Sequence, residues 1–281
     1  MDERNYSDAA LVLLGHGTVL DQESGAVVFQ HAAELRRRRA FAEVREAFWK
    51  QEPQIKTVLA GLKQRRVFIV PLFVSEGYFS DGVIPRELGF WDEAAGRVAR
   101  VRVEGETKLV YCKPVGTHAS VTDLLVQRAQ EVLKQFPFPR PAKASEVSLF
   151  IAGHGTSQSE NSRKAIERQV ELIQARGLFA SVGAVFLEEE PRIADCYALA
   201  ATKFIVVVPF FISEGLHARG DLPVLLGEPE RVVKQRLAAG QEPWRNPTER
   251  KGKLVWYARS LGTAPGLAEV ILERVGEMGG E

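Results

Sequence analysis

Cysteine is scarce in this chain of 281 residues, which contains only two of them. Cys112 and Cys196 lie far apart, and neither belongs to a CxxC pair. Iron–sulfur clusters are held by sets of cysteine thiolates, and disulfide frameworks need several paired cysteines. The sequence therefore encodes neither an iron–sulfur cluster nor a disulfide framework, and two isolated thiols are typical of a protein of the reducing cytoplasm.

Long hydrophobic runs and an excess of one charge are also absent. The longest apolar run, Phe204 to Ile212, has nine residues, whereas a membrane-spanning helix needs about 20. The charged N-terminal residues lack the layout of a signal peptide. Lysine and arginine (37) almost balance aspartate and glutamate (36), so no overall positive field attracts a nucleic acid. We therefore expect neither a membrane nor a nucleic acid as a partner.

Signature motifs for nucleotides and for serine nucleophiles are missing as well. The chain contains no GxxxxGKS/T phosphate loop, no GxGxxG after a strand and no GxSxG elbow. We therefore expect a reaction that uses no nucleotide.

What the chain does contain is an internal repeat. The tetrapeptide Gly-His-Gly-Thr occurs at residues 15–18 and again at residues 153–156, an offset of 138. The same offset aligns residues 70–89 with residues 208–227, and ten of these 20 positions are identical. Agreement over this length indicates a duplicated unit.

A linker separates the two copies. Three prolines fall within residues 137–141, and prolines end a helical stretch and favour extended chain. A cut near residue 140 gives two domains, residues 1–140 and residues 141–281, each large enough to bury a hydrophobic core.

Apolar runs alternate with helical spacing in both halves. Residues 9–14 and 147–152 are short apolar runs that break at Gly-His-Gly, as buried parallel strands do where they enter a loop. Strands that alternate with helices predict a parallel sheet with right-handed crossovers. We expect an α/β fold in which each half has a four-stranded parallel sheet flanked by helices. The expected strands are residues 9–14, 43–50, 67–74 and 108–115, then 147–152, 181–188, 204–212 and 253–260.

Differences between the two halves indicate candidate metal ligands. Lys50 and Phe79 of the first half stand where Glu188 and His217 stand in the second. Loops at the carboxyl ends of parallel strands meet at one edge of the sheet, so Glu188 and His217 are expected near His154 of the repeated tetrapeptide. Two imidazoles and one carboxylate suit divalent iron, cobalt, nickel or zinc and leave coordination positions open. We predict that these three residues bind a metal ion and carry the chemistry.

Other roles for some of these residues stay open. His16 repeats His154 in the half that lacks the other ligands, so a structural role in the Gly-rich turn is an alternative for His154. Glu190 is matched by Glu52 ahead of a repeated proline, which indicates a role at a helix start. Glu188 has no acidic counterpart and is the preferred ligand, with Glu190 as the reserve.

Three segments of the second half resemble one known family. Residues 149–156 (LFIAGHGT), 186–191 (FLEEEP) and 209–223 (PFFISEGLHARGDLP) are similar in order and spacing to the CbiX/SirB family of class II tetrapyrrole chelatases. Short members of this family are single units that form dimers, and long members are internal duplications. The resemblance implies two tandem chelatase-like domains in a chain that acts as a monomer.

The resemblance also implies an enzyme, a sirohydrochlorin metal chelatase. Such enzymes insert Co²⁺ or Fe²⁺, and in some members Ni²⁺, into sirohydrochlorin or a close relative without ATP, during cobalamin or siroheme biosynthesis. The metal ion is then a substrate, and the tetrapyrrole is the partner. By position, the metal-handling histidines of the family fall on His154 and His217, and the acidic partner falls on Glu188. In the first half only His16 survives, so that site is degenerate.

Acid–base chemistry agrees with this implication. Insertion of a divalent ion releases two pyrrolic protons, and neutral imidazoles such as His154 and His217 can accept them. A substrate rich in carboxylates needs basic groups near the cleft, for which Arg86, Arg192 and Arg219 are the candidates. Two other functions stay open: a carrier that binds a tetrapyrrole or a metal without turnover, and a hydrolase that uses the metal to activate water.

Overall fold

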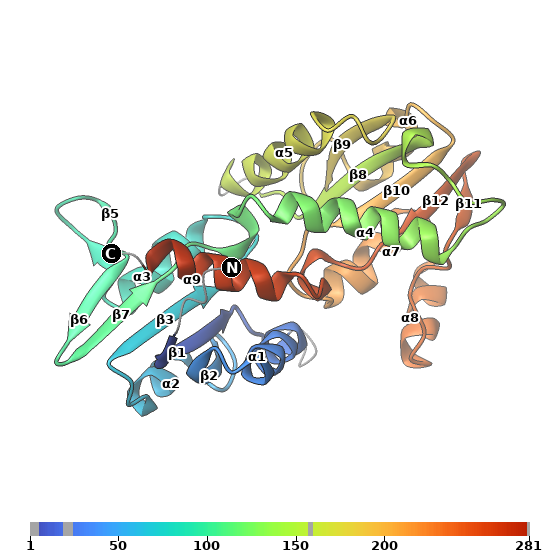
Figure 1. Cartoon of the computed structure of the whole chain (residues 1–281). Helices are drawn as coiled ribbons and strands as arrows, with labels where there is room; N and C mark the ends of the chain where they lie inside the picture. Colours follow the sequence, from blue (N-terminus) through green and yellow to red (C-terminus); the bar gives the residue numbers. More distant parts are fainter. Residues whose placement is uncertain (1–5, 19–24, 157–159, 280–281) are drawn as a thin grey trace. The chain divides into compact units, whose positions relative to one another are not determined.

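The computed structural model of the chain describes residues 6–18, 25–156 and 160–279 (Figure 1). The chain divides into two compact units, of which the first comprises Met1–His118 and Pro265–Glu281 and the second comprises Ala119–Ala264. Each unit contains a five-stranded, mostly parallel sheet with helices packed on it. The α/β class predicted from the sequence is confirmed.

In the first unit, four parallel strands lie in the order β2-β1-β3-β7, and β6 is added antiparallel beside β7 at the edge of the sheet (Figure 1). These strands are β1 (Tyr6–Gly15), β2 (Phe41–Phe48), β3 (Arg66–Pro71), β6 (Val101–Glu104) and β7 (Thr107–Tyr111). A separate hairpin pairs β4 (Trp91–Asp92) with β5 (Arg97–Val98). The helices are α1 (Ala26–Arg38), α2 (Ile55–Gly61), the π-helix η2 (Tyr78–Val83), α3 (Ile84–Glu87), the 3₁₀-helix η3 (Val115–Thr117) and α9 (Leu267–Met278).

The sheet of the second unit has the corresponding order, β9-β8-β10-β12 in parallel, with β11 antiparallel beside β12. These strands are β8 (Val147–Gly153), β9 (Ser181–Phe186), β10 (Phe204–Pro209), β11 (Thr248–Arg250) and β12 (Lys253–Tyr257). The α-helices are α4 (Val121–Gln135), α5 (Glu160–Gln174), α6 (Cys196–Leu199), α7 (Leu222–Leu225) and α8 (Glu230–Ala238). The π-helix is η6 (His217–Asp221), and the 3₁₀-helices are η4 (Ala144–Glu146), η5 (Ile193–Asp195) and η7 (Leu261–Thr263).

The fifth strand of each sheet is an addition to the four that the sequence predicts. Neither β6 nor β11 contains a fully buried residue, so neither has the apolar run by which the central strands were recognised. β11 forms because a tight hairpin pairs it with β12. Lys251 and Gly252, which join it to β12, both have positive φ, at 49° and 72°. Such a two-residue loop matches the twist of paired antiparallel strands.

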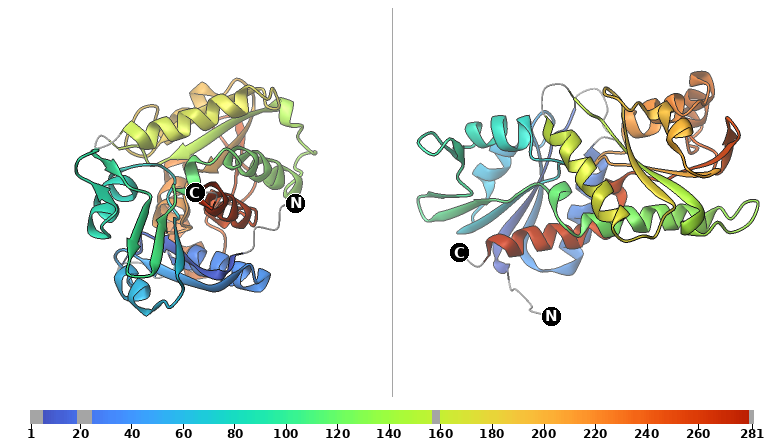
Figure 2. Two further views of the ribbon diagram at one scale, coloured as in Figure 1. Left: turned by 60° about the vertical axis from the view of Figure 1, so that its left-hand side comes forward. Right: turned by 90° about the horizontal axis from the view of Figure 1, so that it is seen from above.

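Helices cover both faces of the central strands. All seven residues of β8 are buried. In the second unit α4 and α5 lie along one face of the sheet (Figure 2). On the other face, a core cluster joins strand residues such as Phe150 to Tyr197 of α6 and Leu222 of α7. Burial on both faces explains why these strands read as continuous apolar runs.

The last helix of each sequence repeat belongs to the compact unit of the other repeat. Within the second unit, Arg128 of α4 donates a hydrogen bond to Thr263 Oγ1 at 2.8 Å. Within the first unit, Arg274 of α9 donates to Pro114 O at 3.0 Å and to Thr117 Oγ1 at 2.8 Å. The compact units therefore differ from the predicted domains 1–140 and 141–281, which remain a prediction about the two sequence repeats.

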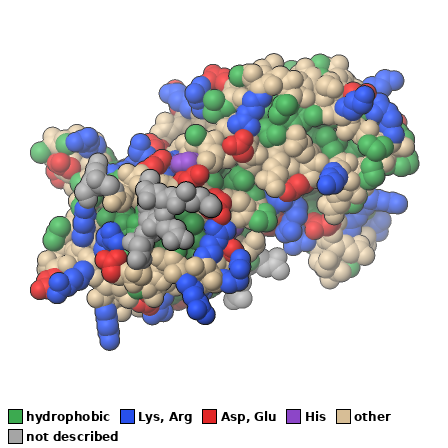
Figure 3. Space-filling view, viewed as in Figure 1, with side chains coloured by type: hydrophobic (Ala, Val, Ile, Leu, Met, Phe, Trp, Pro, Cys, Tyr) green, Lys and Arg blue, Asp and Glu red, His purple; other side chains and the backbone are tan. Residues whose placement is uncertain are grey.

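The surface charges and the helix lengths bear on the expected absence of nucleic-acid and membrane partners. On the face shown in Figure 3, lysine and arginine side chains are interspersed with aspartate and glutamate, as the near-zero net charge predicts. Among the residues that the structure describes, no helix combines the length and the apolar character that crossing a membrane requires.

Candidate active site

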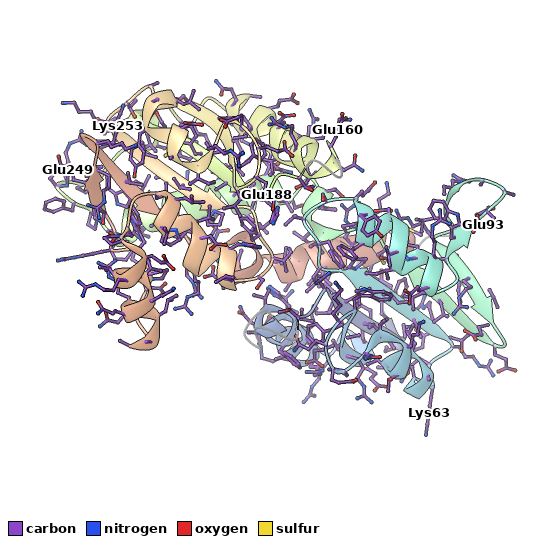
Figure 4. All side chains as sticks on the ribbon, turned by 180° about the vertical axis from the view of Figure 1, so that it is seen from behind. Lys63, Glu93, Glu160, Glu188, Glu249 and Lys253 are labelled. Atoms are coloured by element: carbon purple, nitrogen blue, oxygen red, sulfur yellow. The ribbon has the colours of Figure 1, made fainter. Side chains whose placement is uncertain are left out.

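The three predicted ligands meet at the carboxyl-terminal edge of the second sheet. His154 follows β8, Glu188 follows β9, and His217 opens the π-helix η6 after β10. All three line one pocket with a volume of about 400 Å³. Figure 4 labels Glu188 in the loop that leaves β9. The convergence of loops from three parallel strands therefore occurs where the sequence predicted it.

The two imidazoles lie in contact and present the same ring nitrogen. The ring centroids of His154 and His217 are 5.0 Å apart, and the rings are nearly perpendicular, at 84°. His154 Nδ1 lies 2.6 Å from the carbonyl oxygen of Gly155. A carbonyl oxygen only accepts hydrogen bonds, so Nδ1 carries the proton and the lone pair of the neutral ring is on Nε2.

Asp221 fixes the proton of His217 in the same way. Its Oδ2 atom accepts a hydrogen bond from His217 Nδ1 at 2.7 Å, which again leaves Nε2 as the atom with a lone pair. The sequence analysis did not single out Asp221. The signal was present, because Val83 stands at the corresponding position of the first repeat, just as Phe79 stands at that of His217.

Glu188 lies beside His154, with 3.8 Å between Glu188 Oε2 and His154 Nδ1. Its side chain is 57% exposed and faces the pocket. Glu190, the reserve ligand, is not among the residues that line this pocket. It pairs with Arg192 at 3.3 Å, and its side chain is 76% exposed. The geometry favours Glu188 as the acidic group of the site.

Glu189 has a different, structural task. Its carboxylate accepts hydrogen bonds from the backbone N–H of Thr156 at 2.5 Å and from Arg163 Nε at 2.7 Å. The hydrogen bond from Arg163 lowers the pKa of this carboxyl group. Glu189 therefore holds the loop that carries His154, because successive side chains of an extended segment point to opposite faces and Glu189 points away from Glu188.

The predicted ligands do not form a closed cage. Among residues 6–18, 25–156 and 160–279, no three His, Cys, Asp or Glu side chains are arranged to hold a metal ion together. His154 and His217 are partly exposed, at 39% and 46% of their side-chain surface. Open sets of few ligands suit an ion that has to leave again, whereas structural ions have complete tetrahedral sets.

The first unit keeps the frame of this site and, of the three ligands, only the counterpart of His154, which is His16. His16 and Phe79 have ring centroids 4.7 Å apart at 75°, nearly the arrangement of His154 and His217. Lys50 replaces the carboxylate, and its Nζ atom lies 5.5 Å from the centre of the Phe79 ring. Burial lowers the pKa of His16, and the nearby positive charge of Lys50 lowers it further. This environment disfavours a metal cation.

Each π-helix accepts a hydrogen bond from the hydroxyl of a tyrosine on a nearby strand, β12 for η6 and β7 for η2. Tyr257 donates from its hydroxyl to Ala218 O at 2.5 Å within η6, and Tyr111 donates to Ser80 O at 2.9 Å within η2. Burial raises the pKa of Tyr257 well above its usual value, so its hydroxyl stays a donor. π-Helices are rare and are frequent at functional sites. In η6 this turn carries His217.

None of the three predicted rim arginines lines the histidine pocket. Arg86 stacks on Trp91, with its guanidinium carbon 3.7 Å from the ring centre. Arg192 donates to Leu187 O at 2.8 Å. Arg219 projects from η6 into a separate cavity of about 530 Å³. The structure gives these side chains other contacts, because a position in a loop does not determine the direction of a side chain.

A family model and two curated relatives that match this chain belong to the same group of chelatases. The family model CbiX matches the chain twice, over residues 10–132 and 148–278. A probable sirohydrochlorin cobaltochelatase of Halobacterium salinarum is 39% identical over 280 residues, which cover 96% of this chain and 91% of that protein. A sirohydrochlorin cobaltochelatase of Methanopyrus kandleri is 32% identical over 143 residues, which cover 48% of this chain and 99% of that protein.

Solved structures with the same fold include chelatases. A Deinococcus radiodurans protein, described as multi-domain with structural similarity to chelatases, superposes with a TM-score of 0.74 at 27% identity. The match covers 95% of this chain and 54% of that one. SirB from Bacillus subtilis subspecies spizizenii in complex with cobalt superposes with a TM-score of 0.63 at 18% identity, over 97% of this chain and 95% of that one.

Proposed function

The chain belongs to the CbiX family, and from this premise we propose that it inserts Co²⁺ or Fe²⁺ into sirohydrochlorin at the site in its second repeat. It is an enzyme, and the double match to the family model confirms the predicted pair of tandem chelatase-like domains. The observation that supports the location is the pair of imidazoles, His154 and His217, whose Nε2 lone pairs are available beside one pocket.

The proposed mechanism exchanges a metal ion for two protons. The divalent ion first binds to Nε2 of His154 and His217, and then passes to the four nitrogens of the macrocycle. Two pyrrolic N–H groups must lose their protons as the ion enters. Each imidazole that releases the ion regains a free Nε2 lone pair and can accept one of these protons. Two imidazoles therefore account for both protons, and no nucleotide is needed.

The carboxylates assist the imidazoles in different ways. Asp221 accepts the hydrogen bond from His217 Nδ1, which orients the ring and keeps the lone pair of the neutral imidazole on Nε2, the atom proposed to bind the ion. Glu188 lines the pocket with its Oε2 atom 3.8 Å from His154 Nδ1, so its charge attracts a divalent cation into the pocket. Asp221 is therefore a positioning residue, and Glu188 is the acidic partner that binds the ion.

The choice between metals rests on the chemistry of the ligands. Imidazole and carboxylate groups suit Co²⁺, Fe²⁺ and Ni²⁺, and affinity in such sites rises from iron through cobalt to nickel. The relatives named above are cobaltochelatases, and SirB structures hold cobalt or Fe³⁺. We place Co²⁺ and Fe²⁺ as the substrates, with Ni²⁺ as an ion that the site also accepts.

We also propose that the enzyme acts as a monomer in the cytoplasm. Two repeats in one chain supply what the family's short members gain by forming dimers. Cys112 and Cys196 are both buried and free, in agreement with a reducing compartment.

An anaerobic absorbance assay tests the proposed function. Sirohydrochlorin is mixed with Co²⁺ or Fe²⁺, without nucleotide, and metallation is followed with and without catalytic amounts of the protein. We expect many metallated products per protein molecule, well above the rate without protein. Product that stops at one equivalent per chain indicates a carrier, and a rate equal to the blank contradicts the proposal for that metal.

A further inference from the structure

The lining of the histidine pocket divides by structural element. Loops after the strands and η6 supply its imidazoles and the carboxylates of Glu188 and Asp221. On α8, the charged side chains of Glu230 and Lys234 pair with each other at 2.6 Å. The remaining large side chains are apolar, and most come from α7 and α8. The apolar lining residues are Leu187, Leu216, Val224, Leu225, Val233 and Leu237.

Two of these leucines are unusually accessible. Leu216 is 68% exposed and Leu225 is 44% exposed, whereas Val233 of α8, which lines the same pocket, is 1% exposed. Exposed large apolar side chains that gather at one place mark a binding surface. Pockets for small molecules combine mostly apolar walls with a few polar groups, as this one does. We call the six apolar lining residues of this pocket, which include Leu216 and Leu225, the leucine wall.

Only the second repeat has α8. The offset between the repeats is 138 at Gly89 and Gly227, and it has grown to 146 at the Gly-Thr pairs 116–117 and 262–263. In the first unit the intervening chain forms the β4–β5 hairpin. In the second it forms α8, which contacts η6 and α7. The helix therefore accompanies the repeat that has both imidazoles.

We propose that the leucine wall is the surface on which the tetrapyrrole packs while its centre faces His154 and His217. A tetrapyrrole has a flat apolar face and carries its carboxylates at the periphery, so the face needs an apolar support next to the metal ligands. The leucine wall therefore contributes to the affinity for the macrocycle, whereas the free metal ion is bound by the imidazoles of His154 and His217. This inference rests on the proposed function and identifies the residues that position its substrate.

Binding of sirohydrochlorin in the absence of metal tests the wall. Titration followed by the absorbance and fluorescence of the tetrapyrrole compares the wild type with Leu225→Gln and Leu225→Met. We expect Leu225→Gln to weaken binding roughly tenfold, because it replaces apolar contact by a polar group, and Leu225→Met to bind like the wild type. Co²⁺ binding to the free protein is expected to be the same in all three.

A matched control separates the wall from general surface effects. Leu199 of α6 is also exposed, at 53%, and it does not line the pocket. We expect Leu199→Gln to bind sirohydrochlorin like the wild type. Leu216→Gln provides a second variant of the wall, and thermal unfolding of each variant checks that it folds.

Three results would overturn the inference. Wild-type affinity in both Leu225→Gln and Leu216→Gln would show that the wall does not contact the tetrapyrrole. Self-association of the wild type that Leu225→Gln abolishes, seen by analytical ultracentrifugation, would instead assign the leucines to an interface with a second copy. Failure of the wild type itself to bind sirohydrochlorin would contradict the proposed function, and is recognised before any variant is tested.

Discussion

Among single residues, Asp221 has the most specific effect on the chemistry of the site. Its carboxylate keeps the proton of the neutral His217 ring on Nδ1 and thereby leaves the lone pair on Nε2. Loss of such a partner typically costs ten- to hundredfold in activity. We expect Asp221→Asn to lower kcat for metallation by roughly that factor and to leave KM for the tetrapyrrole unchanged, as measured by steady-state absorbance. An unchanged kcat with a raised KM would contradict the positioning role.

The choice between the two glutamates is also tested at this scale. Glu188 faces the pocket, whereas Glu190 pairs with Arg192 outside it. We expect Glu188→Gln to weaken Co²⁺ binding about tenfold in a calorimetric titration, because the neutral amide no longer attracts the ion. Glu190→Gln serves as the control and is expected to bind like the wild type. The opposite order would move the acidic role to Glu190.

Sequence reasoning located side chains well where the repeat supplied a comparison. Glu188 and His217 stood out because the first repeat lacks them, and the structure brings both into one pocket with His154. The same comparison with Val83 would have found Asp221. The three candidate arginines do not line this pocket, because a place in a loop does not determine the direction of a side chain. Arg86 turns to Trp91 and Arg219 to another cavity, and both directions depend on tertiary packing.

At the scale of elements, the tyrosine that fastens each π-helix gives a matched pair of variants. Tyr257→Phe and Tyr111→Phe each remove one buried hydrogen bond, to Ala218 O and to Ser80 O. We expect each to lower the free energy of unfolding by about 1–3 kcal/mol, since a buried carbonyl loses its donor. Denaturant titration measures this loss. Only Tyr257→Phe is expected to slow metallation, because only η6 carries His217. An equal loss of activity in both variants would contradict this division.

The degenerate site offers a gain-of-function test at the same scale. His16 and Phe79 keep the ring arrangement of the active pair, so the frame for ligands is present. We expect the triple variant Lys50→Glu, Phe79→His and Val83→Asp to raise Co²⁺ binding from about one equivalent to about two. Lys50→Glu alone is the control and should stay near one. A triple variant that folds but binds no additional ion would show that the first unit has lost the frame as well.

Strands could be predicted from the sequence where their residues form a continuous apolar run. The central strands have apolar runs buried on both faces, so they could be read directly from the sequence. The edge strands β6 and β11 could not, because they are short and polar and depend on pairing with a neighbour. For β11 the sequence offers only Gly252, a residue type that suits the positive φ of 72° found in the hairpin.

For the whole molecule, the exchange of terminal helices determines which fragments can fold. Residues 119–264 form a compact unit that includes α4, whereas residues 141–281 lack α4 and carry α9 instead. Val121, Leu125 and Ala129 of α4 are fully buried, so the loss of this helix uncovers apolar core. We expect the fragment 119–264 to melt cooperatively in circular dichroism, and the fragment 141–281 to lack a cooperative transition as a monomer. A cooperative melt of monomeric 141–281 would contradict this expectation.

We expect the second repeat to perform the chemistry and the first repeat to take no part in it. The most direct measurement is anaerobic metallation of sirohydrochlorin by Co²⁺ with the matched variants His154→Ala and His16→Ala, which change equivalent histidines of the two repeats. We expect His154→Ala to fall to the rate without protein and His16→Ala to retain most of the wild-type rate. Loss of activity in His16→Ala together with an active His154→Ala would contradict it.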